Sequence, residues 1–295
     1  MQRFDATLWD AYRLGVRVGA RWPRTAQARA RRVASLLRYP PNLAYWLTPI
    51  DYVRFRELDF ALRAVREFQP APRRVLDISS PKLLPLTVAK GAPEARVLAI
   101  DIVPDEVESV RSAAEYAGVE NLSAELADAR ALRCEDGSFD LITSISVFEH
   151  IAPEADGDVP AARELGRVLA PGGVAVLTVP FSTSYFAEYR EGTVYERASE
   201  RGEPIFFQRF YDLDALRRNI IEPSGLEVAS LGFVEERLFS SDPHRRMAHY
   251  INSNNRQKLF FGPLFFPLSR IFLSAPRPLD ECRKPYIACL VLRKR

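Results

Sequence analysis

The sequence predicts an α/β fold in which a mostly parallel, doubly wound sheet has helices on both faces. Short runs that are apolar on both faces recur along the chain, at residues 73–78, 96–102, 139–145 and 174–180. Segments with helical periodicity lie between these runs, as at 105–117 and 160–169. Strands without a polar face belong inside a covered sheet, and strands that alternate with helices form right-handed parallel crossovers.

The chain before the first strand is expected to form a helical extension, residues 1–69. Residues 1–38 are rich in Arg and Ala and predict helix up to the Pro40-Pro41 pair, which ends it. Residues 51–68 place apolar side chains three and four positions apart, which is typical of an amphipathic helix. The main domain is then residues 70–295.

The main domain is expected to contain seven strands and two insertions. Residues 121–128 predict the third strand, and 226–239 and 286–294 predict the last two. The first insertion, 181–211, is aromatic, charged and irregular. The last two strands are too far apart for a plain connection, so residues 240–284 form a second, Phe-rich insertion.

Charge is unevenly spread along the chain. Residues 1–40 contain nine Arg and two Asp, whereas the remaining residues contain 32 basic and 36 acidic side chains. A slightly acidic body disfavours a nucleic-acid partner, and a basic arm suits phosphates or lipid headgroups.

The cysteines and the hydropathy pattern predict a cytoplasmic location. The three cysteines have no paired spacing, which favours a reducing compartment and disfavours structural zinc. The first residues lack the apolar core of a signal peptide, and no uninterrupted apolar stretch is long enough to span a membrane.

Several different sequence motifs follow one another along the predicted sheet. They are VLDI at 75–78, AID at 99–101, ADA at 127–129, FDLI at 139–142, SVFEHI at 146–151 and RVLAPGGVAVLTVP at 167–180. In this order and spacing the chain resembles the class I S-adenosylmethionine-dependent methyltransferases of the small-molecule type, over roughly residues 70–240 plus the last strand. The resemblance implies a Rossmann-like seven-stranded sheet, S-adenosyl-L-methionine as cofactor, and methyl transfer to a small or lipid-linked acceptor.

Acidic residues at three strand ends are the main candidates for cofactor binding. In open α/β sheets a ligand lies beyond the carboxyl ends of the strands. Asp77 ends the first strand and Asp101 the second, where a carboxylate can accept hydrogen bonds from both hydroxyls of a ribose. The resemblance implies that Asp128 accepts from the adenine amino group beside the Ala129 backbone, and that Ile102 covers a face of the adenine.

Two further residues are assigned to the same site. Arg54, before the first strand, could pair with a carboxylate through two parallel hydrogen bonds. Ser144, on the fourth strand, is included among the cofactor-binding residues.

The loop after the first strand departs from the family pattern. The glycine-rich turn, approximately DxGxGxG, is replaced by the residues DISSPKL at 77–83. In one possible path Ser80 caps a helix that begins at the next residue, and Lys82 faces the methionine carboxylate of the cofactor. In the other, Pro85 delays the helix to about residue 84, and the hydroxyls of Ser79 and Ser80 replace the glycine N–H contacts.

Acceptor chemistry is assigned to SVFEHI and to the first insertion. His150 is a candidate general base, because the pKa of a histidine lies near neutrality. Glu149 and Tyr185 are the other candidates, although positioning alone can suffice for methyl transfer, and no metal is implied. The aromatic residues of 181–211 are expected to cap the acceptor.

The lost glycines leave other functions open. One is a degenerate methyltransferase-like protein that serves as a binding or scaffold subunit, and another is an S-adenosylmethionine-binding enzyme with altered chemistry. The Phe-rich residues 259–275 could dip into a membrane surface beside the basic residues 1–38, cover an apolar substrate, or pack into the core.

Overall fold

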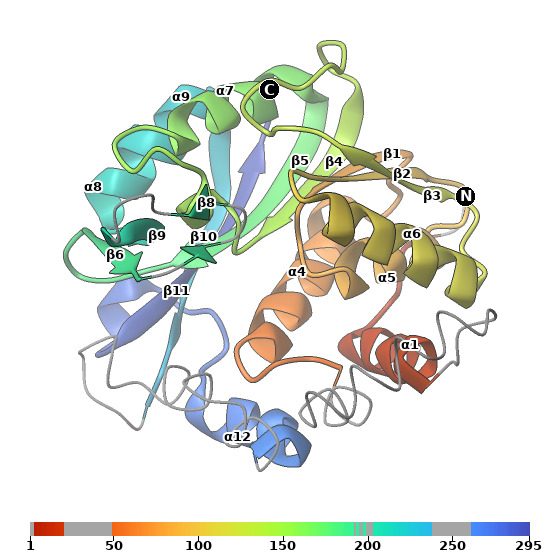
Figure 1. The fold of residues 1–295 in the computed structure, drawn as a ribbon, viewed down its shortest axis with the longest axis horizontal. Helices are drawn as coiled ribbons and strands as arrows, with labels where there is room; N and C mark the ends of the chain where they lie inside the picture. Colours follow the sequence, from red (N-terminus) through yellow and green to blue (C-terminus); the bar gives the residue numbers. More distant parts are fainter. Residues whose placement is uncertain (1–2, 21–48, 192, 195–196, 199–202, 238–260) are drawn as a thin grey trace.

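A seven-stranded sheet forms the centre of the molecule (Figure 1). The computed structural model describes residues 3–20, 49–191, 193–194, 197–198, 203–237 and 261–295. The strands of the sheet are β1 Arg74–Ile78, β2 Arg96–Asp101, β3 Leu122–Leu126, β4 Phe139–Ile145, β5 Leu169–Pro180, β10 Glu227–Glu235 and β11 Pro285–Arg293. Their order is β10-β11-β5-β4-β1-β2-β3, and only β11 runs antiparallel to its neighbours. The predicted seven-stranded, mostly parallel sheet is confirmed.

Helices cover both faces of this sheet (Figure 1). One face packs against α4 (Arg54–Phe68), α5 (Leu83–Gly91) and α6 (Pro104–Ala117), and α1 (Leu8–Ala20) lies against α5. The other face packs against α7 (Asp158–Val168), α8 (Leu213–Leu216), a π-helical turn (Arg217–Ile221) and α9 (Glu222–Ser224). Side chains of alternate strand residues enter the two layers, as with Ile287 and Ala288 in β11, so the strands need apolar residues at every position.

The strand order places a switch point between β1 and β4. From β1 the chain proceeds outward to β2 and β3, and then returns to β4 and β5 on the other side. The loops that follow β1 and β4 therefore separate at the carboxyl edge of the sheet, which is where open α/β sheets bind ligands.

The prediction of helix throughout residues 1–38 is wrong for residues 3–7. These residues are not helical, and Phe4 and Ala6 are buried against Gly91 at the end of α5. The helix begins only after Thr7, whose N–H and hydroxyl both donate to the Asp10 carboxylate, at 2.8 and 2.6 Å. This pair satisfies helix-terminal groups in the manner of a capping box. Residues 21–48 lie outside the described residues.

The first insertion contains an antiparallel hairpin of β6 (Phe186–Arg190) and β9 (Ile205–Phe210). Two short strands, β7 (Thr193–Val194) and β8 (Arg197–Ala198), pair with each other between them. The hairpin contacts β5 and the loop after β4, so it lies near the carboxyl edge of the sheet.

The described part of the second insertion packs against the main domain. It contains a 3-10 turn (Gly262–Leu264), α12 (Phe265–Phe272) and a second 3-10 turn (Leu279–Glu281). Phe265 and Leu273 are buried in the same core as α4. Within the described ranges, every helix is too short or too polar to cross a membrane.

Candidate functional site

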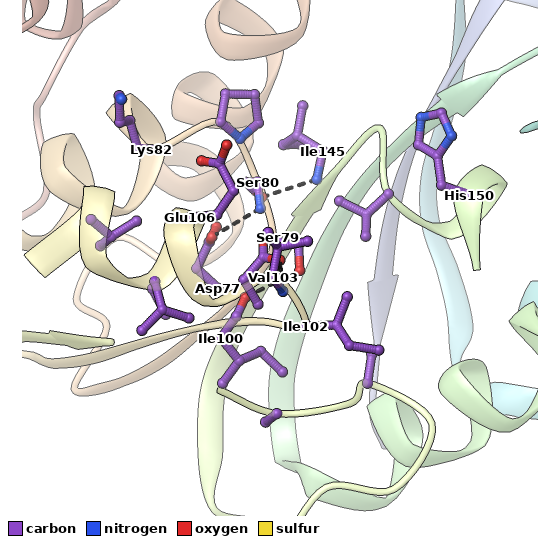
Figure 2. Close-up of a pocket in the computed structure, with 18 of the residues that line it drawn as sticks. Asp77, Ser79, Ser80, Lys82, Ile100, Ile102, Val103, Glu106, Ile145 and His150 are labelled. Atoms are coloured by element: carbon purple, nitrogen blue, oxygen red, sulfur yellow. Dashed lines mark hydrogen bonds between the residues drawn. The ribbon is translucent and has the colours of Figure 1, made fainter. Parts of the chain in front are cut away.

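A cavity of about 710 Å³ opens at the carboxyl ends of β1, β2 and β4 (Figure 2). Its volume is in the range of sites that take a cofactor or a drug-sized ligand. Ten of the residues predicted from the sequence line it: Arg54, Asp77, Ser79, Ser80, Lys82, Asp101, Ile102, Asp128, Ala129 and His150. Three others, Ser144, Glu149 and Tyr185, are not part of the lining.

The helix after β1 begins close to the position that the second of the two predicted paths gives it. Helix α5 begins at Leu83, so Pro85 is its third residue and its missing N–H costs no helical hydrogen bond. Ser79 occupies the first glycine position of the family pattern and has a φ of 51°, in the left-handed region that glycine favours. Its N–H and its hydroxyl both donate to the Ile100 carbonyl, at 2.9 and 3.1 Å. Two hydrogen bonds to β2 therefore hold a serine in a conformation that glycine adopts without strain.

The Asp77 carboxylate holds this loop in place through hydrogen bonds (Figure 2). Its carboxylate accepts from the Ser80 N–H at 3.1 Å and from the Thr143 hydroxyl at 2.5 Å. The Ser80 hydroxyl in turn accepts from the Ile145 N–H of β4 at 3.0 Å. Burial raises the pKa of Asp77 to about 7, although these hydrogen bonds oppose the shift. Asp77 thus joins β1 to β4 across the switch point.

Asp101 and Ile102 form the second wall of the cavity. One carboxylate oxygen of Asp101 accepts from the Val103 N–H at 2.8 Å, which orients the side chain at the end of β2. Ile102 leaves 59% of its surface exposed although it is large and apolar. An exposed apolar side chain beside an oriented carboxylate suits a ligand with a flat ring and hydroxyl groups.

Asp128 has a partner that was not predicted. The Arg130 guanidinium donates to both of its carboxylate oxygens, at 2.6 to 3.0 Å, and the Arg130 N–H donates to it at 2.9 Å. These contacts hold the pKa of the Asp128 carboxyl below its usual value. Arg130 also lines the cavity and donates to the Ala152 carbonyl at 2.8 Å, so it ties the loop after β3 to the loop after β4. Its position two residues after Asp128 was the available sequence signal.

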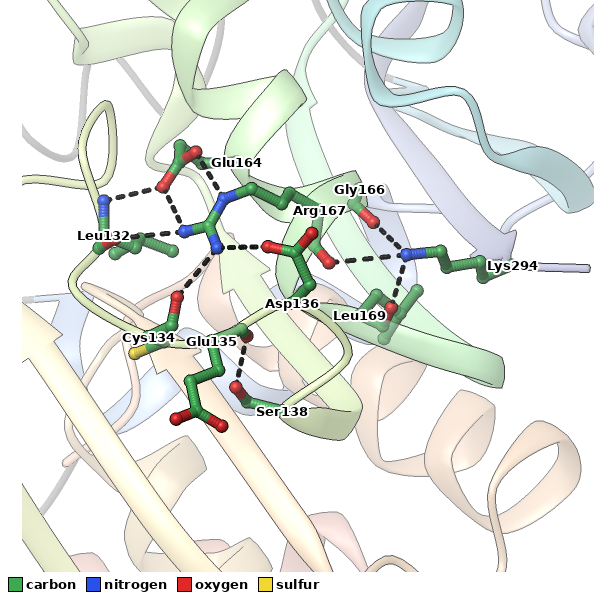
Figure 3. A network of polar contacts seen from close by, with 10 residues as sticks. All are labelled: Leu132, Cys134, Glu135, Asp136, Ser138, Glu164, Gly166, Arg167, Leu169 and Lys294. Atoms are coloured by element: carbon green, nitrogen blue, oxygen red, sulfur yellow. Dashed lines mark hydrogen bonds and ion pairs between the residues drawn. The ribbon is translucent and has the colours of Figure 1, made fainter.

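The loop that carries Asp128 is fixed by Arg167 at its far end (Figure 3). No helix forms between β3 and β4, whose connection is fully described. Arg167, in the last turn of α7, donates to the carbonyls of Leu132 and Cys134 and to the carboxylates of Asp136 and Glu164. A side chain from α7 therefore supplies the support that a helix would give this connection.

Lys82 and Arg54 both line the cavity and supply positive charge to it. The Lys82 ammonium donates to the Ser109 hydroxyl on α6 at 2.7 Å. Arg54 donates to Glu57 at 2.6 Å, one turn further along α4. Glu57 is fully buried and also accepts from the hydroxyls of Ser146 and Thr178, at 2.5 and 2.8 Å. Glu57, which the sequence did not single out, therefore orients Arg54 against the carboxyl edge of the sheet.

His150 reaches the cavity from the short 3-10 helix after β4, Phe148–His150. Its Nδ1 lies 2.8 Å from the Phe207 carbonyl oxygen, which can only accept, so the geometry assigns the hydrogen to Nδ1. In the neutral ring the lone pair is then on Nε2, 3.6 Å from Glu149 Oε1. Glu149 is buried, and desolvation raises its pKa to about 8 even though Arg54 lies nearby.

Ser144 and Tyr185 lie away from the cavity lining. Ser144 is buried within β4, and its hydroxyl donates to the Ile78 carbonyl at 3.3 Å. Tyr185 precedes β6, and its N–H donates to Asp212 at 3.0 Å. In this structure the Ser144 hydroxyl therefore links β4 to β1, and Tyr185 lies near the start of the first insertion.

Arg209 links the first insertion to the wall of the cavity. It is fully buried in β9 and donates to four carbonyls of the loop after β4 at 2.9 to 3.3 Å, those of Phe148, Glu149, Ile151 and Glu154. The same guanidinium contacts the Pro153 carbonyl and lies 3.6 Å from Asp158. No local sequence pattern indicates this residue, because its partners are more than fifty positions away.

Comparison with known proteins gives a family match. Residues 83–173 match the family model described as a methyltransferase domain. The chain is 38% identical over 129 residues to a demethylmenaquinone methyltransferase of Thermus thermophilus, which covers 43% of this chain and 54% of that protein. It is also 36% identical over 104 residues to an uncharacterized 37.1 kDa protein from a transposon of Streptomyces fradiae, covering 35% and 28%. The matches thus extend over about half the length of the first relative and less of the second.

Solved structures share the fold. Coclaurine N-methyltransferase bound to N-methylheliamine and SAH aligns with a TM-score of 0.53 at 13% identity, over 97% of this chain and 95% of that one. The MccD protein aligns with a TM-score of 0.50 at 15% identity, over 83% and 99%. Through the sequence of residues 83–173 and through its fold, this chain resembles the class I S-adenosylmethionine-dependent methyltransferases, as the order of its motifs predicted.

Proposed function

We propose that this chain is an S-adenosylmethionine-dependent methyltransferase that acts on a small or lipid-linked acceptor. The observation that carries the proposal is the convergence of Asp101, Ile102 and Asp128 on one cavity at the switch point of the sheet. The methyltransferase match of residues 83–173 supports it. The name of the Thermus thermophilus relative supports an acceptor of the demethylmenaquinone class.

The residues present fit this cofactor despite the lost glycines. The left-handed Ser79 reproduces the backbone path of a glycine, which keeps the loop after β1 close to the cavity. In the proposal Asp101 accepts from the ribose hydroxyls, Ile102 covers the adenine, and Arg54 or Lys82 faces the carboxylate. When bound, the cofactor supplies a methyl group that its sulfonium has already activated.

In this proposal the residues of this chain hold the acceptor and, where the acceptor loses a proton, accept that proton. The geometry leaves His150 Nε2 as the basic atom, since Nδ1 is committed to the Phe207 carbonyl. For a hydroxyl acceptor His150 takes the proton, and for an amine acceptor orientation and exclusion of water are sufficient. The hairpin of β6 and β9 is proposed to close over this side of the cavity.

The test is calorimetric titration with S-adenosylhomocysteine. Asp101→Asn keeps the shape of the side chain and removes its charge and one acceptor. We expect a loss of affinity of about tenfold or more, because charge-assisted hydrogen bonds contribute roughly 1.5–3 kcal/mol. Asp280→Asn, at an exposed aspartate outside the cavity, is the matched control and should bind like the wild type.

Each outcome assigns the function differently. Binding weaker than millimolar by the folded wild type would refute the proposal and favour a scaffold role. Equal affinity of Asp101→Asn and the wild type would contradict the placement of the ribose. Tight binding without methyl transfer to quinol or other small acceptors would favour an enzyme of altered chemistry.

A further inference from the structure

A second cavity, of about 230 Å³, lies between α1, α4 and α12 and is lined by arginines. Arg56, Arg63 and Arg66 come from α4, and Arg270 comes from α12. Asp59 is the only acidic residue among the described side chains that line it. The cavity is formed on the far side of α4 from the cofactor-type site, and the two sites share no lining residue.

Hydrogen bonds hold three of the four arginines in place. Arg56 donates to the carbonyls of Arg270 and Leu273, at 3.2 and 2.7 Å, and Arg66 donates to the Ala6 carbonyl at 2.6 Å. Arg63 donates to Asp59 at 3.1 Å. These contacts orient Arg56, Arg63 and Arg66 at a cavity whose described lining includes one carboxylate, that of Asp59.

Two buried donors at the cavity have no partner among the described residues. They are Nε of Arg56 and the hydroxyl of Ser269, which is fully buried in α12. Buried polar groups in proteins are nearly always hydrogen-bonded, so an unpaired pair at one cavity indicates a missing acceptor. Burial lowers the pKa of Arg56; Asp59 opposes this shift, and the nearby Arg270, Arg237 and Arg63 add to it. An anion would relieve both the repulsion and the unpaired donors.

The rim of this cavity is aromatic and apolar. Trp9 leaves 49% of its surface exposed and contacts Phe266, with ring centroids 4.8 Å apart. Leu8 and Phe55 also line the cavity. Tryptophan and aliphatic side chains around a cationic centre are typical of sites that take an anion attached to a hydrocarbon group.

We propose that this cavity binds a phosphate group, carried by a lipid headgroup or by a free phosphate compound. Guanidinium groups match the geometry of phosphate and bind it through paired hydrogen bonds. Four arginines against one aspartate favour phosphate over the single charge of a carboxylate. The site is independent of methyl transfer, and its failure would leave the proposed function untouched.

The test compares two double variants in two binding assays. Arg63→Ala/Arg270→Ala removes two exposed arginines of the cavity, whereas Arg163→Ala/Arg217→Ala removes two exposed arginines on the opposite face of the sheet and changes the net charge equally. The probes are inorganic pyrophosphate, titrated by calorimetry, and vesicles of phosphatidylglycerol or phosphatidylcholine, followed by sedimentation. Thermal unfolding shows that each variant is folded.

The expected result is that the cavity variant loses about tenfold or more in affinity for the bound probe, while the control variant stays within about twofold of the wild type. Sedimentation with phosphatidylglycerol but not phosphatidylcholine vesicles, lost in the cavity variant, assigns a lipid headgroup. Pyrophosphate binding without sedimentation assigns a free phosphate compound. Absence of binding to either probe, or an equal loss in both variants, would overturn the proposal.

Discussion

At the scale of single residues, Ser79 sets the path of the loop after β1. Its φ of 51° places a side chain where the family has none. For residues other than glycine this conformation costs roughly 1–2 kcal/mol. The two hydrogen bonds to the Ile100 carbonyl offset that cost, so the loop keeps the glycine path in a sequence that has lost its glycines.

Two substitutions at this position separate strain from hydrogen bonding. Ser79→Gly and Ser79→Ala both remove the hydroxyl, but only glycine relieves the left-handed strain. We expect the glycine variant to be the more stable by about 1 kcal/mol in urea unfolding. At Ser112, within α6, the same pair of variants should show the opposite order, because glycine weakens a helix interior by about 1 kcal/mol relative to alanine. The same order at both positions would contradict the assigned backbone.

Part of the site was predictable at this scale and part was not. Asp77 and Asp101 were predicted because an acid that ends an apolar strand lies at the edge of the sheet where open α/β sheets bind ligands. Arg130 was missed because its contact with Asp128 depends on the turn of a loop and not on a periodic pattern. Glu57 was missed because a single glutamate on a helix usually faces solvent, and only the tertiary structure buries it against Ser146 and Thr178.

At the scale of elements, the cavity wall after β4 is built around Arg209 of the first insertion. The five carbonyls that it contacts belong to a loop with no regular structure beyond one 3-10 turn. This loop also carries His150. The hairpin therefore acts on the site through the backbone it fixes, and the insertion and the wall form one unit.

We expect Arg209→Lys to lower the free energy of unfolding by about 2–4 kcal/mol, because an ammonium has three donors and cannot reach all of these carbonyls. The measurement is equilibrium unfolding in urea at neutral pH. Arg217→Lys, at an exposed position of the π-helical turn, serves as the control and should change stability by less than about 0.5 kcal/mol. A loss below about 1 kcal/mol at Arg209 would show that the loop is held by other contacts.

The elements themselves were predicted well where periodicity is strong. The strands of the sheet were predicted from their apolar patterns, as were the helices at 51–68 and 105–117, which the structure has at Arg54–Phe68 and Pro104–Ala117. The beginning of α1 was not predicted correctly. Arg and Ala favour helix in residues 3–7, but burial of Phe4 against Gly91 holds these residues outside the helix. Tertiary packing overrode local preference there.

At the scale of the whole molecule, the three cysteines differ in how deeply the fold buries them. Cys289 lies in β11 with none of its surface exposed, and burial raises the pKa of its thiol well above the usual value. Cys134 and Cys282 are partly exposed and lie in loops. A thiol reacts as the thiolate and needs access to the reagent, so Cys289 is protected until the sheet opens.

We expect the thiols of Cys134 and Cys282 to react with a thiol reagent in the native protein, without prior unfolding. The third should react only at the rate of global unfolding and accelerate with urea. In the Cys134→Ser/Cys282→Ser variant only the Cys289 thiol remains, and it should react at the slow rate alone. Mass spectrometry measures the labelling. Rapid labelling of this variant under native conditions would mean that β11 detaches without unfolding of the rest.

The position of β11 also affects how the protein is made. It lies between β5 and β10, yet residues 285–293 follow both of them in the chain. A growing chain on the ribosome therefore exposes the edge of β5, and has no partner for β10, until the last of the three strands has emerged. Unpaired strand edges invite pairing with other chains. Synthesis from the amino terminus thus leaves an interval in which these strand edges are open to pairing with other chains, and the interval ends when β11 closes the sheet.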